Sequence, residues 1–419
     1  MIHLRGHYDG NASALFWICV RTSLLSMITL GIYWFWGLVR IRRYFWAASA
    51  LGQDRFRYTG TGLEKILGFI IALVSLSLFF GLLNLVLMFV YPDVFEEQGS
   101  PEGTLATSVF VIANALAFYF WINFAIYSAY RYKLTRTSWR GRHFGVEQGA
   151  FGYAFRALLL LFATIASLGL LAPLQTFFLR RYMVNRTWYG TAKFQQGGNW
   201  WALYPGLKHI LFALLATFLA GFITAIGENA GLGLVEFLEI AARAILTFWL
   251  IAGVFYYYLY TFNYMTRQQT LDGIITFDIN ISLARIILII FVGLLVLLGI
   301  TLVYAALYVA IVDLTVGIEF AMQFIATINN PEEAIFVPRS FRFLPAITGF
   351  ISLFILTIFY FIVVRGMLLV AINERIIAHI VQSITLVNAP HLNQIGGRGD
   401  ELDTDGEGFA TALGTDSIT

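Results

Sequence analysis

The stretch Thr29–Thr61, TLGIYWFWGLVRIRRYFWAASALGQDRFRYTGT, is repeated later in the chain. The second copy is Ser167–Asn199, SLGLLAPLQTFFLRRYMVNRTWYGTAKFQQGGN, and the two copies align without a gap. The positions that both copies share are Leu30, Gly31, Arg42, Arg43, Tyr44, Gly52, Phe56 and Gly60, matched by Leu168, Gly169, Arg180, Arg181, Tyr182, Gly190, Phe194 and Gly198. An internal repeat of this length predicts that the chain is built from similar structural units.

The composition is typical of a membrane protein. Hydrophobic residues make up 59% of the 419 residues and charged residues only 12%, whereas a soluble domain has about 25% charged residues. The apolar residues form continuous runs that are long enough to cross a hydrocarbon core of about 30 Å. Continuous apolar runs are typical of membrane helices and not of membrane β-strands. They therefore predict an all-α polytopic membrane protein.

Eight hydrophobic segments are expected, at residues 12–38, 66–90, 105–130, 154–179, 207–227, 237–263, 283–312 and 345–371. Lysine and arginine favour the cytoplasmic side of short loops, and 17 of the 27 basic residues lie in the connections 40–65, 131–156 and 180–208. The connections 91–104 and 228–236 contain acidic residues and no basic ones. Eight simple crossings cannot place all three basic connections in the cytoplasm, because a full crossing by 154–179 would put 180–208 outside.

The repeated segments 12–38 and 154–179 resolve this conflict if they do not cross the membrane. Both contain residues that interrupt a helix, which are Gly31, Gly169 and Pro173. Such breaks are tolerated in a membrane where protein or water satisfies the freed backbone groups. We therefore predict two broken segments that are re-entrant or interfacial, six full transmembrane helices, and both termini in the cytoplasm. The alternative is eight spans.

Short alternating polar and apolar sequences precede several hydrophobic segments. We call them hooks, and they are RFRYTGTGLEKI, HFGVEQGAFGYAF, KFQQGGNWWALY, ITFDINISLARI and, at the start of the chain, LRGHYDGNASALF. Alternation together with turn residues predicts short strands or hairpins at the cytoplasmic membrane surface. Asn11, Thr61, Asn199 and Ser282 are expected N-caps of the helices that follow.

The predicted organisation is two repeat units, a third helical hairpin and a tail. The boundaries are 1–140 for the first unit, 141–275 for the second, 276–389 for the hairpin and 390–419 for the tail. The tail is rich in glycine and acidic residues and is expected to be disordered. From Pro390 onward its charge is −5, so the rest of the chain carries +8.

Clusters of basic and aromatic residues are the first candidate site. They are Arg42, Arg43 and Tyr44 in one copy and Arg180, Arg181 and Tyr182 in the other, together with Arg21 and Arg156 in the broken segments. Such clusters bind anionic lipid headgroups or other acidic ligands. The competing interpretation is simple anchoring of the topology at the membrane interface.

Two further arginines, Arg243 and Arg365, lie within hydrophobic segments. A charged residue at that depth is costly and usually faces a bundle interior or a polar cavity. Glu236 and Glu239 are possible partners of Arg243 on the same helix face. For Arg365 the alternative is that its side chain extends toward the cytoplasmic interface.

No signature of catalysis is present in the sequence. It has no zinc-protease, phosphate-loop or serine-hydrolase motif, and its six histidines are scattered. The single cysteine, Cys19, excludes a cysteine-based metal site and is expected to be a small buried apolar residue. We therefore expect no enzyme activity, no cofactor and no metal.

Two functions fit these features. The first is transport or handling of an anionic small molecule or lipid through a cavity between the repeats, as in transporters with repeated, broken helices. The second is a non-catalytic membrane scaffold or partner subunit that docks another protein through its basic face and acidic tail. The expected partners are anionic membrane lipids and an unidentified protein, and no nucleic acid.

The stretch TLGIYWFWGLVRIRRYFW, followed by GQDRFRYTGTGLEKILGF, resembles the repeated signature of the YjgN family of bacterial inner-membrane proteins. The matching positions are Thr29–Tyr33, Trp36, Arg40, Arg43, Tyr44, Gly52, Phe56 and Gly60–Gly62. The sequence GEGFATALG in the tail is also similar to the end of that family's sequences, and Phe35 stands where the family often has the proline that Pro173 preserves. The resemblance implies a multi-pass protein of the bacterial inner membrane with a domain of unknown function, and it implies no substrate or reaction.

Overall fold

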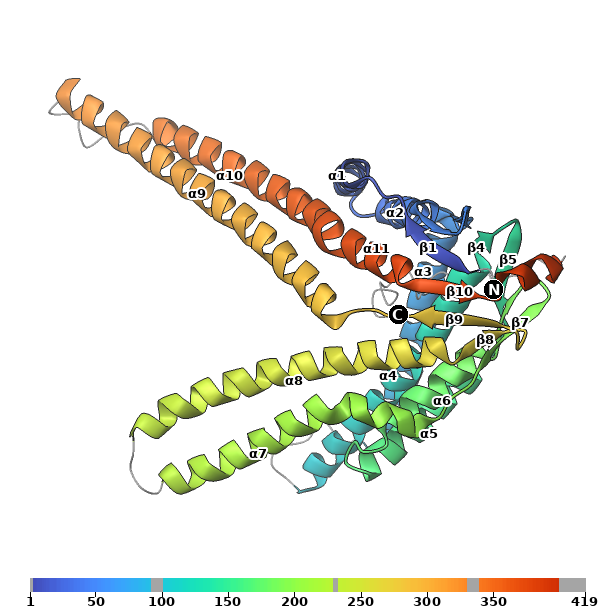
Figure 1. Ribbon diagram of the computed structural model, residues 1–419. Helices are drawn as coiled ribbons and strands as arrows, with labels where there is room; N and C mark the ends of the chain where they lie inside the picture. The colour runs from blue at the N-terminus through green and yellow to red at the C-terminus, as the bar shows by residue number, and fades with distance from the viewer. Residues whose placement is uncertain (1–2, 92–100, 229–232, 330–338, 399–419) are drawn as a thin grey trace. The chain divides into compact units, whose positions relative to one another are not determined.

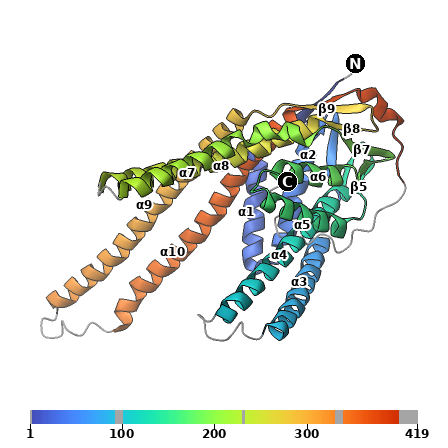
Figure 2. The same cartoon turned by 90° about the horizontal axis from the view of Figure 1, so that it is seen from below.

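The computed structural model describes residues 3–91, 101–228, 233–329 and 339–398 (Figures 1 and 2). The elements follow one another as β1 (Leu4–Tyr8), α1 (Ala12–Ile28), α2 (Trp34–Ala48), β2 (Ser49–Leu51), β3 (Asp54–Tyr58), α3 (Gly62–Val90), α4 (Pro101–Thr135), β4 (Thr137–Trp139), β5 (Arg142–Val146), α5 (Ala150–Ala166), α6 (Ala172–Val184), β6 (Thr187–Tyr189), β7 (Ala192–Gln196), η2 (Trp200–Leu207), α7 (Lys208–Glu228), α8 (Gly233–Arg267), β8 (Gln269–Leu271), β9 (Ile275–Ile279), α9 (Leu283–Asn329), α10 (Arg339–Leu368), η3 (Leu369–Glu374), α11 (Arg375–Gln382), β10 (Ile384–Val387) and η4 (Ala389–Gln394).

The ten strands of the described chain form one closed antiparallel barrel, so the prediction of an all-α fold is wrong. Around the barrel the order is β1-β10-β9-β8-β7-β6-β5-β4-β3-β2. Four consecutive hairpins pair edge to edge, and the barrel is closed by β1 and β10, where Leu4 lies opposite Leu386. Because closure pairs both edges of every strand, even these short strands can form a stable sheet.

Each hairpin of the barrel has a short first strand, a tight turn and a five-residue second strand. In the β4–β5 turn, Arg140 and Gly141 both have positive φ angles, of 51° and 71°, which is the conformation that matches the twist of a two-residue hairpin. Each predicted hook contains at least four residues of the second strand of one such unit, and the hook at the start of the chain contains β1. The turns gather at one end of the barrel. The strand ends that lead into helices therefore lie at the other end, here called the helix rim.

The barrel interior is filled by aromatic and aliphatic side chains. Phe56, Phe144, Phe194 and Phe277 occupy the middle of β3, β5, β7 and β9, and neighbouring ring centroids are 6.5, 6.5 and 5.9 Å apart. The buried residues around them are Trp139, Tyr189, Ala192, Leu271, Ile275 and Leu386. This packing makes the barrel a small hydrophobic core and not a pore.

The segment after β10 packs against the barrel core. Ala389 and Leu392 of η4, and Ile395 after it, belong to the same buried cluster as the strands. The predicted disordered tail, 390–419, thus begins with residues that are folded onto the barrel as far as Arg398. Its remaining residues, 399–419, lie outside the described part of the chain.

Within the described residues, six helical segments are long and apolar enough, by length and composition, to cross a membrane. They are Gly62–Val90, Thr104–Thr135, Trp200–Phe222, Ile240–Arg267, Leu283–Thr315 and Ile347–Gln382. Along them, large apolar side chains such as Phe89, Phe218 and Phe248 are exposed. Exposed apolar surface of this extent is expected where lipid, not water, surrounds the helices. The number agrees with the six full spans expected from the charge distribution.

The two repeated segments form helical hairpins, α1–α2 and α5–α6. The chain reverses at Gly31 (φ 92°) and Gly169 (φ 88°), positions where glycine tolerates a left-handed conformation. In both turns the glycine N–H bonds back to a carbonyl five residues earlier, at 2.6 and 2.7 Å. Pro173 lies in the first turn of α6, where its missing N–H has no cost. The breaks predicted at Gly31 and Gly169 are therefore the hairpin turns, whereas Pro173 lies within α6.

Asn11, Thr61 and Asn199 are at helix starts as predicted, and Asn199 accepts a hydrogen bond from Trp201 N–H at the start of η2. The Asn11 side chain accepts hydrogen bonds from the backbone N–H groups of Ser13 and Ala14 at the start of α1. Thr61 caps α3 through Glu64 N–H.

The chain divides into two compact units. One contains Met1–Tyr8, Trp46–Leu283 and Ile380–Thr419, and therefore the barrel with α3 to α8; the other contains Asp9–Phe45 and Ala284–His379. In the first unit α7 and α8 run side by side (Figures 1 and 2). The boundaries expected from the repeat stay a prediction, although the barrel takes strands from all three of those segments.

Candidate functional site

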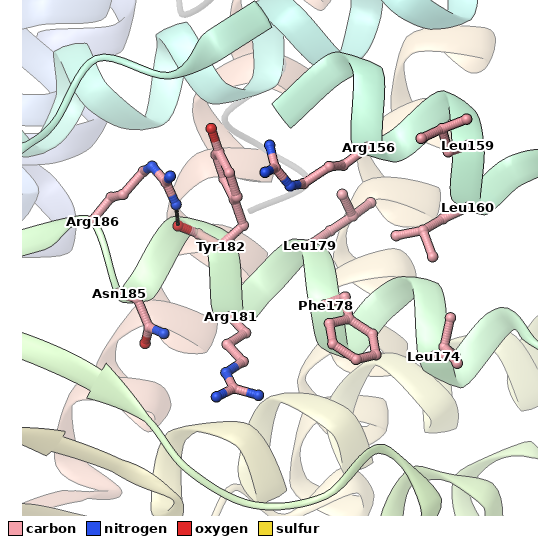
Figure 3. A pocket seen from close by; sticks show the side chains of 10 residues that line it. All are labelled: Arg156, Leu159, Leu160, Leu174, Phe178, Leu179, Arg181, Tyr182, Asn185 and Arg186. Atoms are coloured by element: carbon pink, nitrogen blue, oxygen red, sulfur yellow. Dashed lines mark hydrogen bonds between the residues drawn. The ribbon is translucent and has the colours of Figure 1, made fainter. Parts of the chain in front are cut away.

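A pocket of about 490 Å³ lies along the α5–α6 hairpin in the unit that contains the barrel (Figure 3). We call it the α5–α6 pocket. Its lining residues are Arg156, Leu159, Leu160, Leu174, Phe178, Leu179, Arg181, Tyr182, Asn185 and Arg186. They combine three guanidinium groups with a wall of leucine and phenylalanine.

Tyr182 organises the cationic part of the pocket. The Arg186 guanidinium carbon lies 3.6 Å from the Tyr182 ring centroid, and that of Arg156 lies 4.7 Å from it. Figure 3 shows the ring between the two arginines. Stacking on an aromatic face orients a guanidinium while leaving its N–H groups available for an anion. The two arginines are therefore held in place before any ligand arrives.

Backbone contacts fix this arrangement. The Tyr182 hydroxyl donates to the Gly149 carbonyl at 3.0 Å, which ties the end of α6 to the start of α5. Arg156 Nη1 donates to the Gly152 carbonyl at 3.0 Å, and Arg186 Nη1 donates to the Tyr182 carbonyl at 3.4 Å. Each guanidinium has five N–H donors, so most remain available for a ligand.

No carboxylate is present among the residues that line the α5–α6 pocket. The nearest acidic residue in sequence, Glu147, forms an ion pair with Lys193 at 2.6 Å. Three arginines without a lining carboxylate give the pocket a positive potential. Such a pocket attracts phosphate or carboxylate groups, which arginine binds through two parallel hydrogen bonds.

The pocket is polar at one end and apolar along the rest. Arg186 is adjacent to β6, and Arg181 lies in the last turn of α6, so both are near the helix rim of the barrel. Leu159, Leu160 and Leu174 lie closer to the hairpin turn, and Leu168 at that turn is 94% exposed. An exposed leucine at the tip of an apolar hairpin is typical of insertion into lipid. The layout matches a molecule with an anionic head and an apolar body.

The first hairpin does not reproduce this pocket. Its tyrosine, Tyr44, is equivalent to Tyr182 and likewise donates to a carbonyl at the start of the hairpin, that of Asn11, at 2.8 Å. Ile18 and Ala48 stand where Arg156 and Arg186 stand in the second copy. The cationic group is thus not a general requirement of the hairpin, because the first copy folds without it.

Glu374 Oε1 lies 3.0 Å from the same Tyr44 hydroxyl, so the Asn11 carbonyl and this carboxylate share its single O–H donor. The first copy therefore has a negative group where the second copy presents positive ones.

The sequence-predicted residues are distributed over several places. Arg156, Arg181 and Tyr182 meet in the α5–α6 pocket. Arg180 does not line it and instead lies with its guanidinium carbon 5.2 Å from the ring of Phe262 in α8. Because Arg180 and Arg181 are consecutive residues of a helix, their side chains lie on different faces of α6.

The first-copy residues lie in the other unit. Arg21 and Arg43 are exposed and Arg42 is half-buried. The cavity expected between the repeats stays a prediction.

The two arginines in apolar segments have different surroundings. Arg365 Nη1 donates to the buried Ser23 Oγ at 3.2 Å, and its guanidinium carbon lies 4.0 Å from the Trp34 ring centroid. Arg243 is exposed on α8. The side chains of its expected partners, Glu236 and Glu239, lie outside the described residues.

Sequence reasoning missed Arg186 and Asn185 as pocket residues. Arg186 follows Tyr182 by four positions, a spacing that places two residues on one helix face. Arg186 lies two residues beyond the end of α6 at Val184, so a helical pattern does not include it in that face. Among the residues with described side chains, no group of three or more His, Cys, Asp or Glu side chains lies close enough together to hold a metal ion.

The apolar helices, the two helical hairpins and the small closed barrel define a class of protein in which apolar helices alternate along the chain with the strands of one β-barrel. The family described as a bacterial protein of unknown function (DUF898) matches residues 3–411, so the chain belongs to this family.

Relatives of the chain carry the name inner membrane protein YjgN. The protein of that name from Salmonella typhimurium is 31% identical over 165 residues, which cover 38% of this chain and 36% of the relative. The one from Escherichia coli K12 is 42% identical over 55 residues, or 13% of this chain and 14% of the relative. The matched regions thus span about a third or less of the relatives' length. No solved structure matches the chain.

Proposed function

We propose that this chain is a multi-pass protein of the bacterial inner membrane that binds an anionic lipid of the cytoplasmic leaflet in the α5–α6 pocket. The membrane location is supported by the six apolar helical segments and by the names of its relatives. Binding is the step that any lipid transport or lipid handling by this protein would require first.

The distribution of charge supports a cytoplasmic barrel. The three connections richest in lysine and arginine, 40–65, 131–156 and 180–208, contain strands β2 to β7. Basic residues favour the cytoplasmic side. Because β1 pairs with β10 in the same barrel, the first and last strands belong on the same side of the membrane.

The observation that carries the proposal is the direction in which polarity changes along the α5–α6 pocket. Its arginines are near the helix rim of the barrel, and its leucines and Phe178 continue toward the exposed tip at Leu168. With the barrel in the cytoplasm and the tip in the membrane, a lipid phosphate meets the arginines while its acyl chains follow the apolar wall.

The magnitudes favour a lipid over a free anion. Each arginine near an anionic surface contributes about 1 kcal/mol, and each buried methylene of an acyl chain about 0.8 kcal/mol. An apolar segment of a few carbons therefore contributes as much as all three arginines. A soluble phosphate lacks that contribution.

The test compares lipid retention by the purified full-length protein. Native mass spectrometry with phosphatidylglycerol and phosphatidylethanolamine measures retention by the native chain, by the double variant Arg156→Gln with Arg186→Gln, and by Arg243→Gln as a matched control. The loss of two charges, about 2 kcal/mol, should lower phosphatidylglycerol retention roughly thirtyfold. The control should retain it.

Two results would refute the proposal. One is unchanged retention of phosphatidylglycerol by the double variant. The other is equal retention of both lipids by the native protein. Inorganic phosphate as a competitor distinguishes a lipid site from a phosphate site, since it should displace the lipid only if the headgroup alone provides the affinity.

A further inference from the structure

A second hollow lies on the outer surface of the barrel, across β3, β4 and β5. Its volume is about 380 Å³. It is lined by Asp54, Arg55, Arg57, Thr59, Ser138, Trp139, Arg140, Gly141 and His143. We call it the β3–β5 hollow. It is distinct from the α5–α6 pocket and shares no residue with it.

The β3–β5 hollow is positively charged. Three arginines and one aspartate line it, so its net charge is +2 when His143 is neutral. Asp54 forms an ion pair with Arg140, with 2.5 Å between Oδ2 and Nε. Arg55 and Arg57 are alternate residues of β3, so both side chains point outward from the barrel. The hollow is therefore suited to an acidic ligand.

The described chain ends on the same barrel. Arg142 Nη1, in β5, donates to the Leu392 carbonyl at 3.0 Å. Thr191, in the β6–β7 turn, exchanges two hydrogen bonds with Gly396, at 3.1 and 3.0 Å. The Arg398 guanidinium carbon lies 4.9 Å from the Trp188 ring of β6. The chain thus leaves the barrel beside β6.

The residues that follow are strongly acidic. Between 399 and 419 there are six acidic residues and no basic one, and five of them lie in Asp400–Glu407. From β6 to β3 there are three strand spacings, or about 15 Å at roughly 4.8 Å each. About five residues of extended chain cover that distance. The stretch from Arg398 to Asp403 is therefore long enough to span the distance to the hollow.

We infer that the acidic segment Asp400–Glu407 docks on the β3–β5 hollow of its own molecule. Opposite charge, a fixed starting point beside β6 and sufficient length all favour this occupant over a separate partner. Tethering also raises the effective concentration of the segment at the hollow. The barrel offers a natural control, because β9 is also three strands from β6 but carries Asp278 and no arginine.

Disulfide trapping in the full-length protein tests the inference. Thr404→Cys is combined with Thr59→Cys at the hollow, or with Thr276→Cys on β9 as the matched control. None of these changes alters charge, and native Cys19 is fully buried and is distinguished by peptide mapping. Under mild oxidation we expect the Thr59 pair to form its disulfide about tenfold faster than the Thr276 pair.

The charge dependence provides the second measurement. Neutralising the segment, with Asp400→Asn, Glu401→Gln, Asp403→Asn, Asp405→Asn and Glu407→Gln, should remove the preference for Thr59, and so should high salt. Equal rates at the two positions would overturn the inference. Disulfides that join two molecules, seen as a dimer on denaturing gels, would overturn it as well.

Discussion

The Tyr182 hydroxyl donates a hydrogen bond of 3.0 Å to the Gly149 carbonyl, and this contact closes the α5–α6 hairpin at its barrel end. The same ring supports Arg156 and Arg186. One side chain thus links the fold of the hairpin to the charge of the α5–α6 pocket.

Replacing Tyr182 by phenylalanine separates these two roles. The ring and its arginine contacts remain, and the loss of the hydrogen bond should cost about 1 kcal/mol of stability. We expect a lower thermal unfolding midpoint in detergent with phosphatidylglycerol retention largely preserved. Tyr182→Leu should lose retention too, since no aromatic face remains. Equal retention by both variants would contradict the stacking role.

Arginine and lysine should not be interchangeable at position 186. Arg186→Lys keeps the charge but loses the planar group that stacks 3.6 Å from Tyr182. We expect the lysine variant to bind phosphatidylglycerol almost as weakly as Arg186→Gln, by titration in native mass spectrometry. Full binding by the lysine variant would show that charge alone is sufficient.

The hairpin turn requires glycine at position 169. Gly169 has φ 88° and no atom within 4 Å of an added Cβ, so alanine there tests backbone conformation alone. Gly169→Ala should destabilise the protein by about 1–3 kcal/mol. Gly81→Ala in α3, also without a neighbour near its Cβ, is the control and should be neutral or slightly stabilising. The thermal unfolding midpoints of the two variants measure this difference in stability.

The packing of the barrel requires glycine at position 145. A Cβ at this position would lie 2.1 Å from Trp188 Cζ2, and Trp188 is buried in β6. Gly145→Ala forces β5 and β6 apart, at a cost of about 1–3 kcal/mol or more. We expect a large drop in the unfolding midpoint, and the double variant Gly145→Ala with Trp188→Leu should recover part of it. No recovery would mean that another contact is responsible.

Barrel stability should fall at high pH because of Tyr189. Its hydroxyl donates to the Trp139 carbonyl at 2.9 Å, and burial raises the pKa of this phenol, although Arg142 opposes the shift. A raised pKa in the folded state means that the contribution is complete below the unfolded pKa of about 10 and is lost as pH rises above it. Tyr189→Phe should therefore lose less stability between pH 9 and 11 than the native chain.

The helices could be predicted from the sequence because their signal is local. Continuous apolar runs and the breaks at Gly31 and Gly169 are visible within about thirty residues, and the structure contains both hairpins. The repeat also predicted that Tyr44 and Tyr182 are equivalent, and in the structure each hydroxyl donates to a backbone carbonyl at the start of its own hairpin.

The barrel could not be predicted because its strands are short and their partners are distant. Phe56 and Phe144 belong to separate hooks, and only strand pairing brings their rings within 6.5 Å. Each hook alone has too few residues to form a stable sheet. Arg186 was missed for a related reason, since it joins the pocket just after α6 ends.

The pairing of Leu4 with Leu386 has a consequence for biosynthesis. Strand β1 is translated before the six apolar helical segments of the described chain, but its neighbour β10 is translated only after them. Until then the nascent sheet has unpaired edges, which are sites of aggregation and of proteolysis. A chain interrupted before β10 should therefore keep these edges unpaired and be degraded faster than the full chain, so that the last strand to be translated decides the survival of the whole molecule.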